Sequence, residues 1–182
     1  MADVRLDRYE NAWYRPGGVL KRTVWYFTNL MFFKTMLPFP SSFKVFLLRL
    51  FGAGVGRGVV IKPDVNIKYP WFLKIGDHVW IGENVWIDSL GKIEIGDHVV
   101  VSQGAYLLTG SHDYKAAAFD LIVRDIRLED GVWIGARSVV CPGVTCHSHS
   151  ILTVGSVATA DLDAYGIYQG NPAVRKRTRK IS

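Results

Sequence analysis

Aliphatic residues return at every sixth position along most of the chain between residues 55 and 157. The six-residue groups open at Val55, Ile61, Ile67, Ile75, Ile81, Ile87, Ile95, Val101, Leu107, Leu128, Ile134, Val140, Cys146 and Leu152. A period of six matches neither the helical period of about 3.6 residues nor the strand period of about two. A fixed short period is typical of a repeat architecture in which short strands alternate with tight corners. The pattern therefore predicts a parallel β-helix with three sides, each coil being built from three groups.

A second inward position follows four residues after each opening residue, and it usually holds a small or aliphatic side chain. Its members are Val59, Val65, Val79, Val85, Val99, Ala105, Ser111, Val132, Ser138, Val144, Ser150 and Ser156. Two extra residues enter between Ile67 and Ile75, and again between Ile87 and Ile95, which predicts matched enlargements of one corner. The repeat then lapses after His112. Because long loops in compact domains tend to be functional, we expect a protruding functional loop at 113–125.

The ends of a solenoid need caps, and the flanking sequence can supply them. The apolar run Val24–Leu37 and the segment Phe43–Phe51, which Ser41 or Ser42 could cap, predict two short helices. We expect a helical cap at 1–54, the β-helix at 55–160 and a C-terminal extension with a basic tail at 161–182.

The same helices also fit a second role, as amphipathic helices that bind a membrane surface. Such helices would place Trp25, Tyr26 and the interspersed cations at the membrane–water interface. The apolar run is too short to span a bilayer, which needs about 20 residues. A peripheral contact with the inner face of a membrane is therefore an alternative to a simple cap, and the two are compatible.

Composition narrows the class of function. A chain of 182 residues that is 49% hydrophobic suits one domain with a continuous core. The net charge of +6 and the pI near 9.4 do not indicate nucleic-acid binding, because the surplus gathers at the chain ends. The spacing of Cys141 and Cys146 fits neither a zinc site nor a disulfide framework, and Met1–Gly18 does not resemble a signal peptide. We expect a cytoplasmic protein.

His112 is the residue best placed for chemistry, because it stands where the repeat opens into the loop. An imidazole can accept a proton at neutral pH, as a general base must, and from its position alone a surface histidine at a corner is an equal alternative. His78 and His98 share one slot in neighbouring coils, and His147 and His149 share a strand face, but catalytic zinc usually takes three protein ligands. No Gly-x-Ser-x-Gly elbow occurs, so acyl transfer, if present, should be direct and without metal.

Four motifs together resemble the left-handed β-helix acyltransferases: Thr109–Tyr114, Val132–Ala136, Pro142–Val144 and Gly170–Ala173. More narrowly, the chain is similar over essentially its whole length to the colanic acid biosynthesis O-acetyltransferases, near the maltose and galactoside acetyltransferases. The resemblance implies the left hand of the coil and a homotrimer with acetyl-CoA in the groove between neighbouring β-helices. It also implies a saccharide acceptor, free or lipid-linked, from a surface or exported polysaccharide.

The resemblance further implies roles for individual residues. His112 matches the general base, and Asn84 matches an asparagine beside the acceptor hydroxyl. The expected substrate-binding residues are Asp88, Asp113 and Tyr114. The expected cofactor-binding residues are Trp133, Gly135, Ala136, Val154, Gly155, Arg175 and Arg177. Two other functions stay open: a metalloenzyme like the β-helix carbonic anhydrases, which would need three convergent histidines, and a non-catalytic scaffold.

Overall fold

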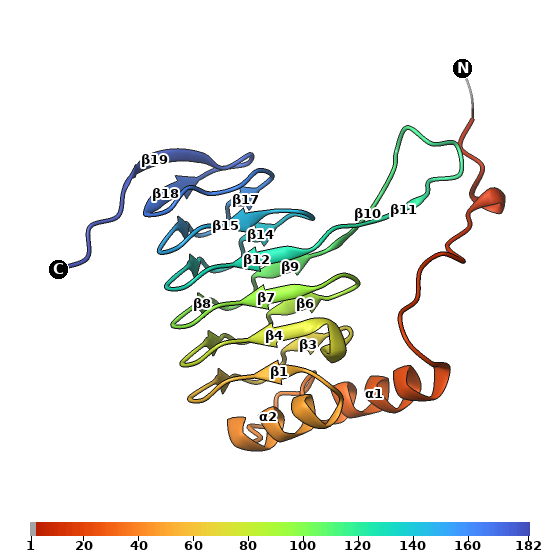
Figure 1. Ribbon diagram of the computed structural model, residues 1–182, viewed down its shortest axis with the longest axis horizontal. Coiled ribbons are helices and arrows are strands. Elements are labelled where there is room, and N and C mark those ends of the chain that lie inside the picture. Colours follow the sequence, from red (N-terminus) through yellow and green to blue (C-terminus); the bar gives the residue numbers. More distant parts are fainter. Residues whose placement is uncertain (1–2) are drawn as a thin grey trace.

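The computed structural model describes residues 3–182 and shows a solenoid of about six coils built from three parallel sheets (Figure 1). Sheet A contains β1 (Gly54–Val55), β4 (Leu73–Ile75), β7 (Ile93–Ile95), β12 (Ile126–Leu128) and β15 (Thr145–Cys146). Sheet B contains β2 (Val60–Ile61), β5 (Trp80–Ile81), β8 (Val100–Val101), β13 (Trp133–Ile134), β16 (Ile151–Leu152), β18 (Gly166–Gln169) and β19 (Val174–Thr178). Sheet C contains β3 (Asn66–Ile67), β6 (Trp86–Asp88), β9 (Tyr106–Leu108), β14 (Val139–Val140) and β17 (Val157–Ala158). The predicted fold class is confirmed.

The core is a set of stacked aliphatic ladders at the predicted inward positions. In sheet B, Ile81 pairs with Val101, Val101 with Ile134, and Ile134 with Leu152, and all four side chains are fully buried. Cys146 is also fully buried, as its slot in the repeat predicts. Each coil covers the apolar side chains of the coil before it, which is how a solenoid buries its interior.

The excursion from the solenoid is a β-hairpin rather than a simple loop, and it projects well away from the coils (Figure 1). β10 (Gly110–His112) pairs antiparallel with β11 (Leu121–Val123). The prediction that Ser111 faces inward is wrong, because Ser111 is exposed in this hairpin. The coil ends two residues before Ser111, at Thr109. The buried Thr109 hydroxyl donates to the Asp88 carbonyl at 2.6 Å and accepts from the Gly91 N–H at 2.9 Å.

The hairpin leaves the solenoid at the corner between sheets C and A. The two-residue enlargements predicted between Ile67 and Ile75, and between Ile87 and Ile95, fall at this same corner in the preceding coils. There the Tyr69 N–H donates to the Ser89 hydroxyl at 3.0 Å, and the short helix η2 (Pro70–Phe72) fills the turn. The corner between sheets C and A therefore carries both enlargements and the hairpin.

Two helices cover the open end of the first coil, α1 (Val19–Phe32) and α2 (Ser41–Leu50). α1 begins and ends about five residues earlier than the apolar run suggests. Ser41 does not cap α2, since it is already the first helical residue. Its hydroxyl instead accepts a hydrogen bond from the Ile61 N–H at 3.0 Å and so ties the helix to β2.

The last coil extends beyond the predicted limit at residue 160. Leu162 bridges to Cys146, and β18 continues sheet B beside β16. The aliphatic register fades there because Tyr168, which is largely buried, replaces a smaller inward residue. Most of the basic tail lies in β19, which pairs antiparallel with β18.

Candidate active site

His112 lies half-buried between two aromatic rings. Its imidazole stacks on Phe119, with the ring centroids 4.5 Å apart and the planes 9° apart, and the Tyr9 ring lies 5.8 Å away. The Nδ1 atom is 2.8 Å from the Phe119 carbonyl oxygen. A carbonyl can only accept a hydrogen bond, so Nδ1 must carry the proton. In a neutral imidazole this leaves the lone pair on Nε2, which is then free to accept a proton.

The N-terminal arm, residues 3–17, passes the tip of the hairpin and descends to the start of α1 (Figure 1). The Arg5 N–H donates to the Ala117 carbonyl at 2.8 Å near the hairpin tip, and the Tyr14 hydroxyl donates to the Leu90 carbonyl at 2.7 Å near its base. These contacts bring the Tyr9 ring to the imidazole. Sequence reasoning missed this part of the site because the arm has no periodic pattern, and its tyrosines were the only signal.

The two residues after His112 begin the connection between β10 and β11, residues 113–120, which forms the hairpin tip. The Asp113 carboxylate accepts a hydrogen bond from the Lys115 N–H at 2.9 Å, and the Asp113 N–H donates to the Asp120 carbonyl at 2.8 Å. This is the pattern of an Asx-turn, so Asp113 shapes the tip. Tyr114 is 79% exposed and makes no packing contact with the imidazole among the described residues.

Asp88 ends β6 beside the base of the hairpin. Burial raises the pKa of its carboxyl group, and the ammonium of Lys68, 3.8 Å away, partly opposes that rise. Gly110 approaches so closely that a Cβ atom there would lie 3.5 Å from Asp88 Oδ2. A largely buried carboxylate with one loose partner is a candidate for ligand binding.

Asn84 and most of the expected cofactor residues lie at another corner, between sheets B and C. Backbone hydrogen bonds stack this corner from coil to coil: Gly104 N–H to Glu83 O (2.8 Å), Arg137 N–H to Gln103 O (3.0 Å) and Gly155 N–H to Ala136 O (2.9 Å). Asn84, Arg137 and Gly155 share the left-handed conformation, with φ of 61°, 56° and 66°. The structure thus brings Asn84 into line with Arg137 and Gly155, and Ala136 lies one residue before that line.

The surface at this corner combines apolar and polar side chains and is partly hollowed. Trp133 is 45% exposed on sheet B, with its indole N–H donating to the Ser102 hydroxyl at 2.9 Å, and Val154 is 70% exposed. Gly135 lies against the next coil, where a Cβ atom would come within 2.6 Å of Val154 N. A cavity of about 530 Å³ opens beside Asn84, lined also by Glu83, Gln103, Gly104, Tyr106, Arg137 and Val139.

The two expected phosphate ligands lie on β19. Arg175 is partly engaged, because its guanidinium lies 3.3 Å from Asp163 Oδ2 and 3.3 Å from the Thr178 hydroxyl. Arg177 pairs with Ile167 across the β18–β19 ladder and is exposed.

A single chain does not assemble the expected site. His112 extends from the corner between sheets C and A, whereas Ala136 and Gly155 lie at the corner between sheets B and C. Within residues 3–182, no hydrogen bond joins His112 to Asn84 or Asp88. His112 and the expected cofactor-binding residues of one chain therefore flank opposite edges of sheet C.

The remaining histidines are arranged along the corner between sheets A and B. The His78 and His98 rings stack with centroids 5.2 Å apart and planes 12° apart. His147 and His149 lie in a turn rather than on a strand; His147 Nδ1 is 3.3 Å from Glu129, and His149 packs against Tyr165. Across the described part of the chain, no group of three or more histidine, cysteine, aspartate or glutamate side chains could hold a metal ion.

The chain is similar in sequence and in structure to known acetyltransferases. No family model matches the chain. It is 38% identical over 166 residues to the colanic acid biosynthesis acetyltransferase WcaF of Escherichia coli (strain K12), covering 91% of each chain. It is 28% identical over 129 residues to the galactoside O-acetyltransferase of the same strain, covering 69% of this chain and 64% of that protein. The structure of the hexapeptide-repeat acetyltransferase VCA0836 from Vibrio cholerae O1 biovar eltor, complexed with acetyl coenzyme A, matches with a TM-score of 0.79 and 28% identity, covering 89% and 88% of the two chains.

Proposed function

The chain belongs to the hexapeptide-repeat acetyltransferases, and from that premise we propose that it moves the acetyl group of acetyl-CoA to a hydroxyl of a saccharide. The acetyl-CoA held by VCA0836 supports the donor. The relatives named for colanic acid and galactoside support a saccharide acceptor, and the first of them supports a role in polysaccharide biosynthesis. The observation that carries the proposal is the 2.8 Å contact between His112 Nδ1 and the Phe119 carbonyl oxygen, which leaves Nε2 free to accept a proton.

In the proposed reaction, His112 Nε2 takes the proton of the acceptor hydroxyl as its oxygen attacks the thioester carbonyl. The carbon–sulfur bond then breaks, and the imidazolium returns the proton to the departing thiolate. A positioned base contributes roughly 10²–10⁴-fold to such a step. Because the Phe119 carbonyl holds Nδ1–H, the base needs no further group to select its tautomer.

The outer faces of the solenoid support a homotrimer. The outward positions of sheet A are polar, including Lys74, Glu94 and Arg127. Those of the other two sheets include exposed apolar side chains: Trp80, Val100 and Trp133 on sheet B, and Tyr106 on sheet C. Exposed apolar faces of this kind mark interaction surfaces. In the proposed trimer they contact neighbouring chains and line the groove for acetyl-CoA, so that the hairpin of one chain completes the site of another.

The outer face of the two helices supports a peripheral membrane contact. Leu20, Val24, Phe27 and Met31 form one exposed row on α1, and Phe46 and Leu50 continue it on α2; we name this surface the N-terminal face. Residues 11–63 contain no aspartate or glutamate, while their cations, apart from the fully buried Lys44, are Arg15, Lys21, Arg22, Lys34, Arg49, Arg57 and Lys62. None of the helices within residues 3–182 could cross a membrane. An apolar helix face with surrounding cations suits an anionic membrane surface, here proposed to be the inner face.

The test is acetyl transfer itself. The purified protein is incubated with acetyl-CoA and a panel of nucleotide-linked and lipid-linked saccharides, with mass spectrometry of the products. We expect an O-acetylated sugar and release of coenzyme A. Absence of acetyl-CoA binding in calorimetry would refute the proposal and favour a scaffold, whereas zinc-dependent hydration of carbon dioxide would favour the metalloenzyme.

A further inference from the structure

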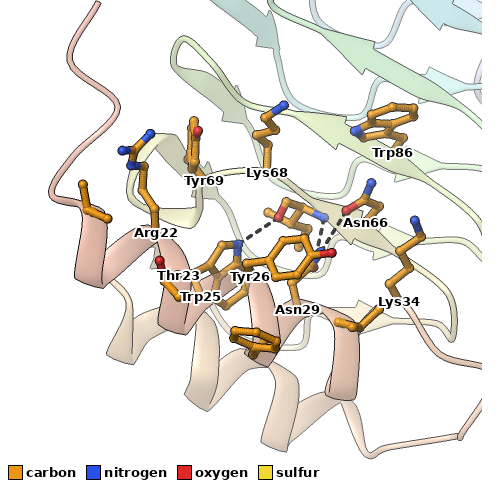
Figure 2. A pocket seen from close by; sticks show the side chains of 14 residues that line it. Arg22, Thr23, Trp25, Tyr26, Asn29, Lys34, Asn66, Lys68, Tyr69 and Trp86 are labelled. Carbon is orange, nitrogen blue, oxygen red and sulfur yellow. Dashed lines mark hydrogen bonds between the residues drawn. The ribbon is translucent and has the colours of Figure 1, made fainter.

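A cavity of about 590 Å³ lies between α1 and the first strands of sheet C, and the proposed reaction does not use it (Figure 2). Its lining combines cations, aromatic rings and amides: Arg22, Lys34, Lys68, Tyr26, Tyr69, Trp86, Asn29 and Asn66. Figure 2 shows Arg22, Lys68 and Lys34 spread along the rim, with Tyr26 on the helix side and Trp86 on the sheet side. No residue of this lining is an aspartate or glutamate.

The floor of the cavity is rigid. The Trp25 indole N–H donates to the Ile67 carbonyl at 2.9 Å. The Asn29 amide donates to Asn66 Oδ1 at 2.8 Å and accepts from the Ile67 N–H at 3.2 Å. Because these bonds use the oxygen of Asn66, its amide NH₂ is left as a donor on the sheet side of the cavity. A preformed pocket with a few placed donors is the usual form of a small-ligand site.

The cations of the cavity are poorly neutralised. Arg22 Nε is buried without a hydrogen-bond partner among the described residues, and Lys68 has only the long 3.8 Å contact with Asp88. A neutral sugar would not require several cations, whereas phosphate oxygens accept charge-assisted hydrogen bonds from arginine and lysine. The aromatic rings beside them can cover the apolar face of an adjoining sugar ring.

The position of the cavity indicates how such a ligand is attached. Phe27 lines the cavity and also belongs to the exposed row of the N-terminal face. In the other direction, Lys68 reaches from the cavity to Asp88 at the base of the hairpin. The cavity is thus bordered on one side by the apolar N-terminal face, which would contact the membrane. On the other side it is bordered by Lys68 and Asp88, next to the candidate active site.

We infer that this cavity binds the phosphate or diphosphate group of a lipid-linked saccharide, with the lipid in the membrane under the N-terminal face and the sugar directed past Lys68 toward Asp88. The inference rests on the proposed function, because it names the carrier of the saccharide acceptor. It identifies the cavity as the place where the enzyme distinguishes a membrane-bound acceptor from a free sugar.

The test compares flotation of the purified protein with two kinds of phosphatidylcholine vesicle. One kind carries a short polyprenyl diphosphate, and the other carries enough phosphatidylglycerol to give the same surface charge. We expect at least about tenfold tighter binding to the diphosphate vesicles, since one charge-assisted hydrogen bond contributes about 1.5–3 kcal/mol, or roughly 10–100-fold. Lys34→Glu should remove this preference. Lys180→Glu, which makes the same charge change in the C-terminal tail, should retain it.

Equal binding to both vesicle types would overturn the inference, and so would binding of free inorganic diphosphate as tight as that of the lipid form. Lys34 is exposed, so its variant should fold, and a milder Lys34→Gln variant with a partial loss would support the same site. Calorimetry with acetyl-CoA on the same preparations separates the two proposals. If the diphosphate preference persists without acetyl-CoA binding, the proposed function fails and the cavity assignment stands.

Discussion

The proposed proton-accepting role of His112 rests on a hydrogen bond to a backbone oxygen and not on a second titratable side chain. Phe119, with φ of 56°, turns its carbonyl toward Nδ1 and also lays its ring on the imidazole. The carbonyl selects the tautomer without adding a charge beside the base. The same residue therefore orients the imidazole through both a hydrogen bond and stacking.

Replacement of His112 tests this role. His112→Ala should lower kcat by at least about 10²-fold while acetyl-CoA binding stays near wild type. His112→Asn is the matched variant, because its amide can still donate to the Phe119 carbonyl but cannot act as a base, and it should lose as much activity. Steady-state kinetics and calorimetry measure both. Activity within a few-fold of wild type in either variant would remove His112 from the mechanism.

Asp88 predicts a stability that depends on pH. Burial holds its pKa above the unfolded value of about 3.9, so its ionisation destabilises the fold as the pH rises from about 4 through the folded pKa. Asp88→Asn should therefore raise the melting temperature at pH 7, and the gain should disappear near pH 3. If Asp88 also binds the acceptor, the same variant should raise KM for the saccharide. A lower melting temperature at pH 7 would contradict the assignment of burial as the dominant cause.

Single residues also show what the sequence could and could not predict. Cys146 was correctly placed in the core, because its slot in the repeat decides its burial. Ser111 was misplaced, because it keeps the spacing of the repeat after the chain has left the coil. The contact of Tyr9 with His112 was not predictable, since it joins segments far apart in the sequence without a periodic pattern.

At the scale of elements, the corners of the solenoid differ in which residues their backbone geometry allows. The corner between sheets B and C needs close approach of backbones at Gly135 and a left-handed conformation at Gly155. Side-chain spacing predicts the strands well, because each inward residue must match the coil beneath it. It does not predict the hairpin, whose strands β10 and β11 bury no ladder residue.

Two glycine substitutions test the close backbone approach at Gly135 and the left-handed conformation at Gly155 separately. Gly135→Ala would place a Cβ atom 2.6 Å from Val154 N and 2.7 Å from Leu152 O, which the packed coil cannot relieve without moving. We expect a loss of about 1–3 kcal/mol or more, with about 2–4 °C of melting temperature for each kcal/mol. Gly155→Ala meets open space and should cost only the left-handed strain of about 1 kcal/mol. Thermal melts check the order, and a larger loss at Gly155 would contradict it.

At the scale of the whole molecule, positive charge and exposed apolar side chains coincide at the N-terminal end of the solenoid. The N-terminal face lies at the start of the solenoid, within a stretch of sequence that has cations and no carboxylates. The helical segments were predictable from their apolar runs. Which of their side chains face outward was not, because burial of Trp25 against the first coil sets the rotation of α1.

Membrane binding by this end predicts flotation with anionic vesicles that weakens with salt. Phe46→Glu, in the N-terminal face but outside the cavity, should lower binding by about 10–100-fold, because burying one phenylalanine contributes about 1.5–3 kcal/mol. Val174→Glu is the control, since Val174 is 49% exposed at the far end of the solenoid while Phe46 is 59% exposed. Raising the salt from about 0.1 to 1 M shortens the Debye length from about 10 to 3 Å and should release the wild type. Equal flotation of both variants would contradict membrane contact through this face.

The arrangement of chains decides whether the site is complete. In one chain, His112 and Ala136 flank opposite edges of sheet C, so we expect each site of the trimer to take His112 from one chain and Ala136 from its neighbour. His112→Ala and the groove-blocking Ala136→Trp should each be inactive alone. When the two are co-expressed equally, about three-quarters of the trimers are mixed, and each mixed trimer has one intact site of three. Roughly a quarter of wild-type activity should therefore return, as measured by acetyl transfer. If mixed trimers are shown to form without recovery, both residues belong to the same chain's site.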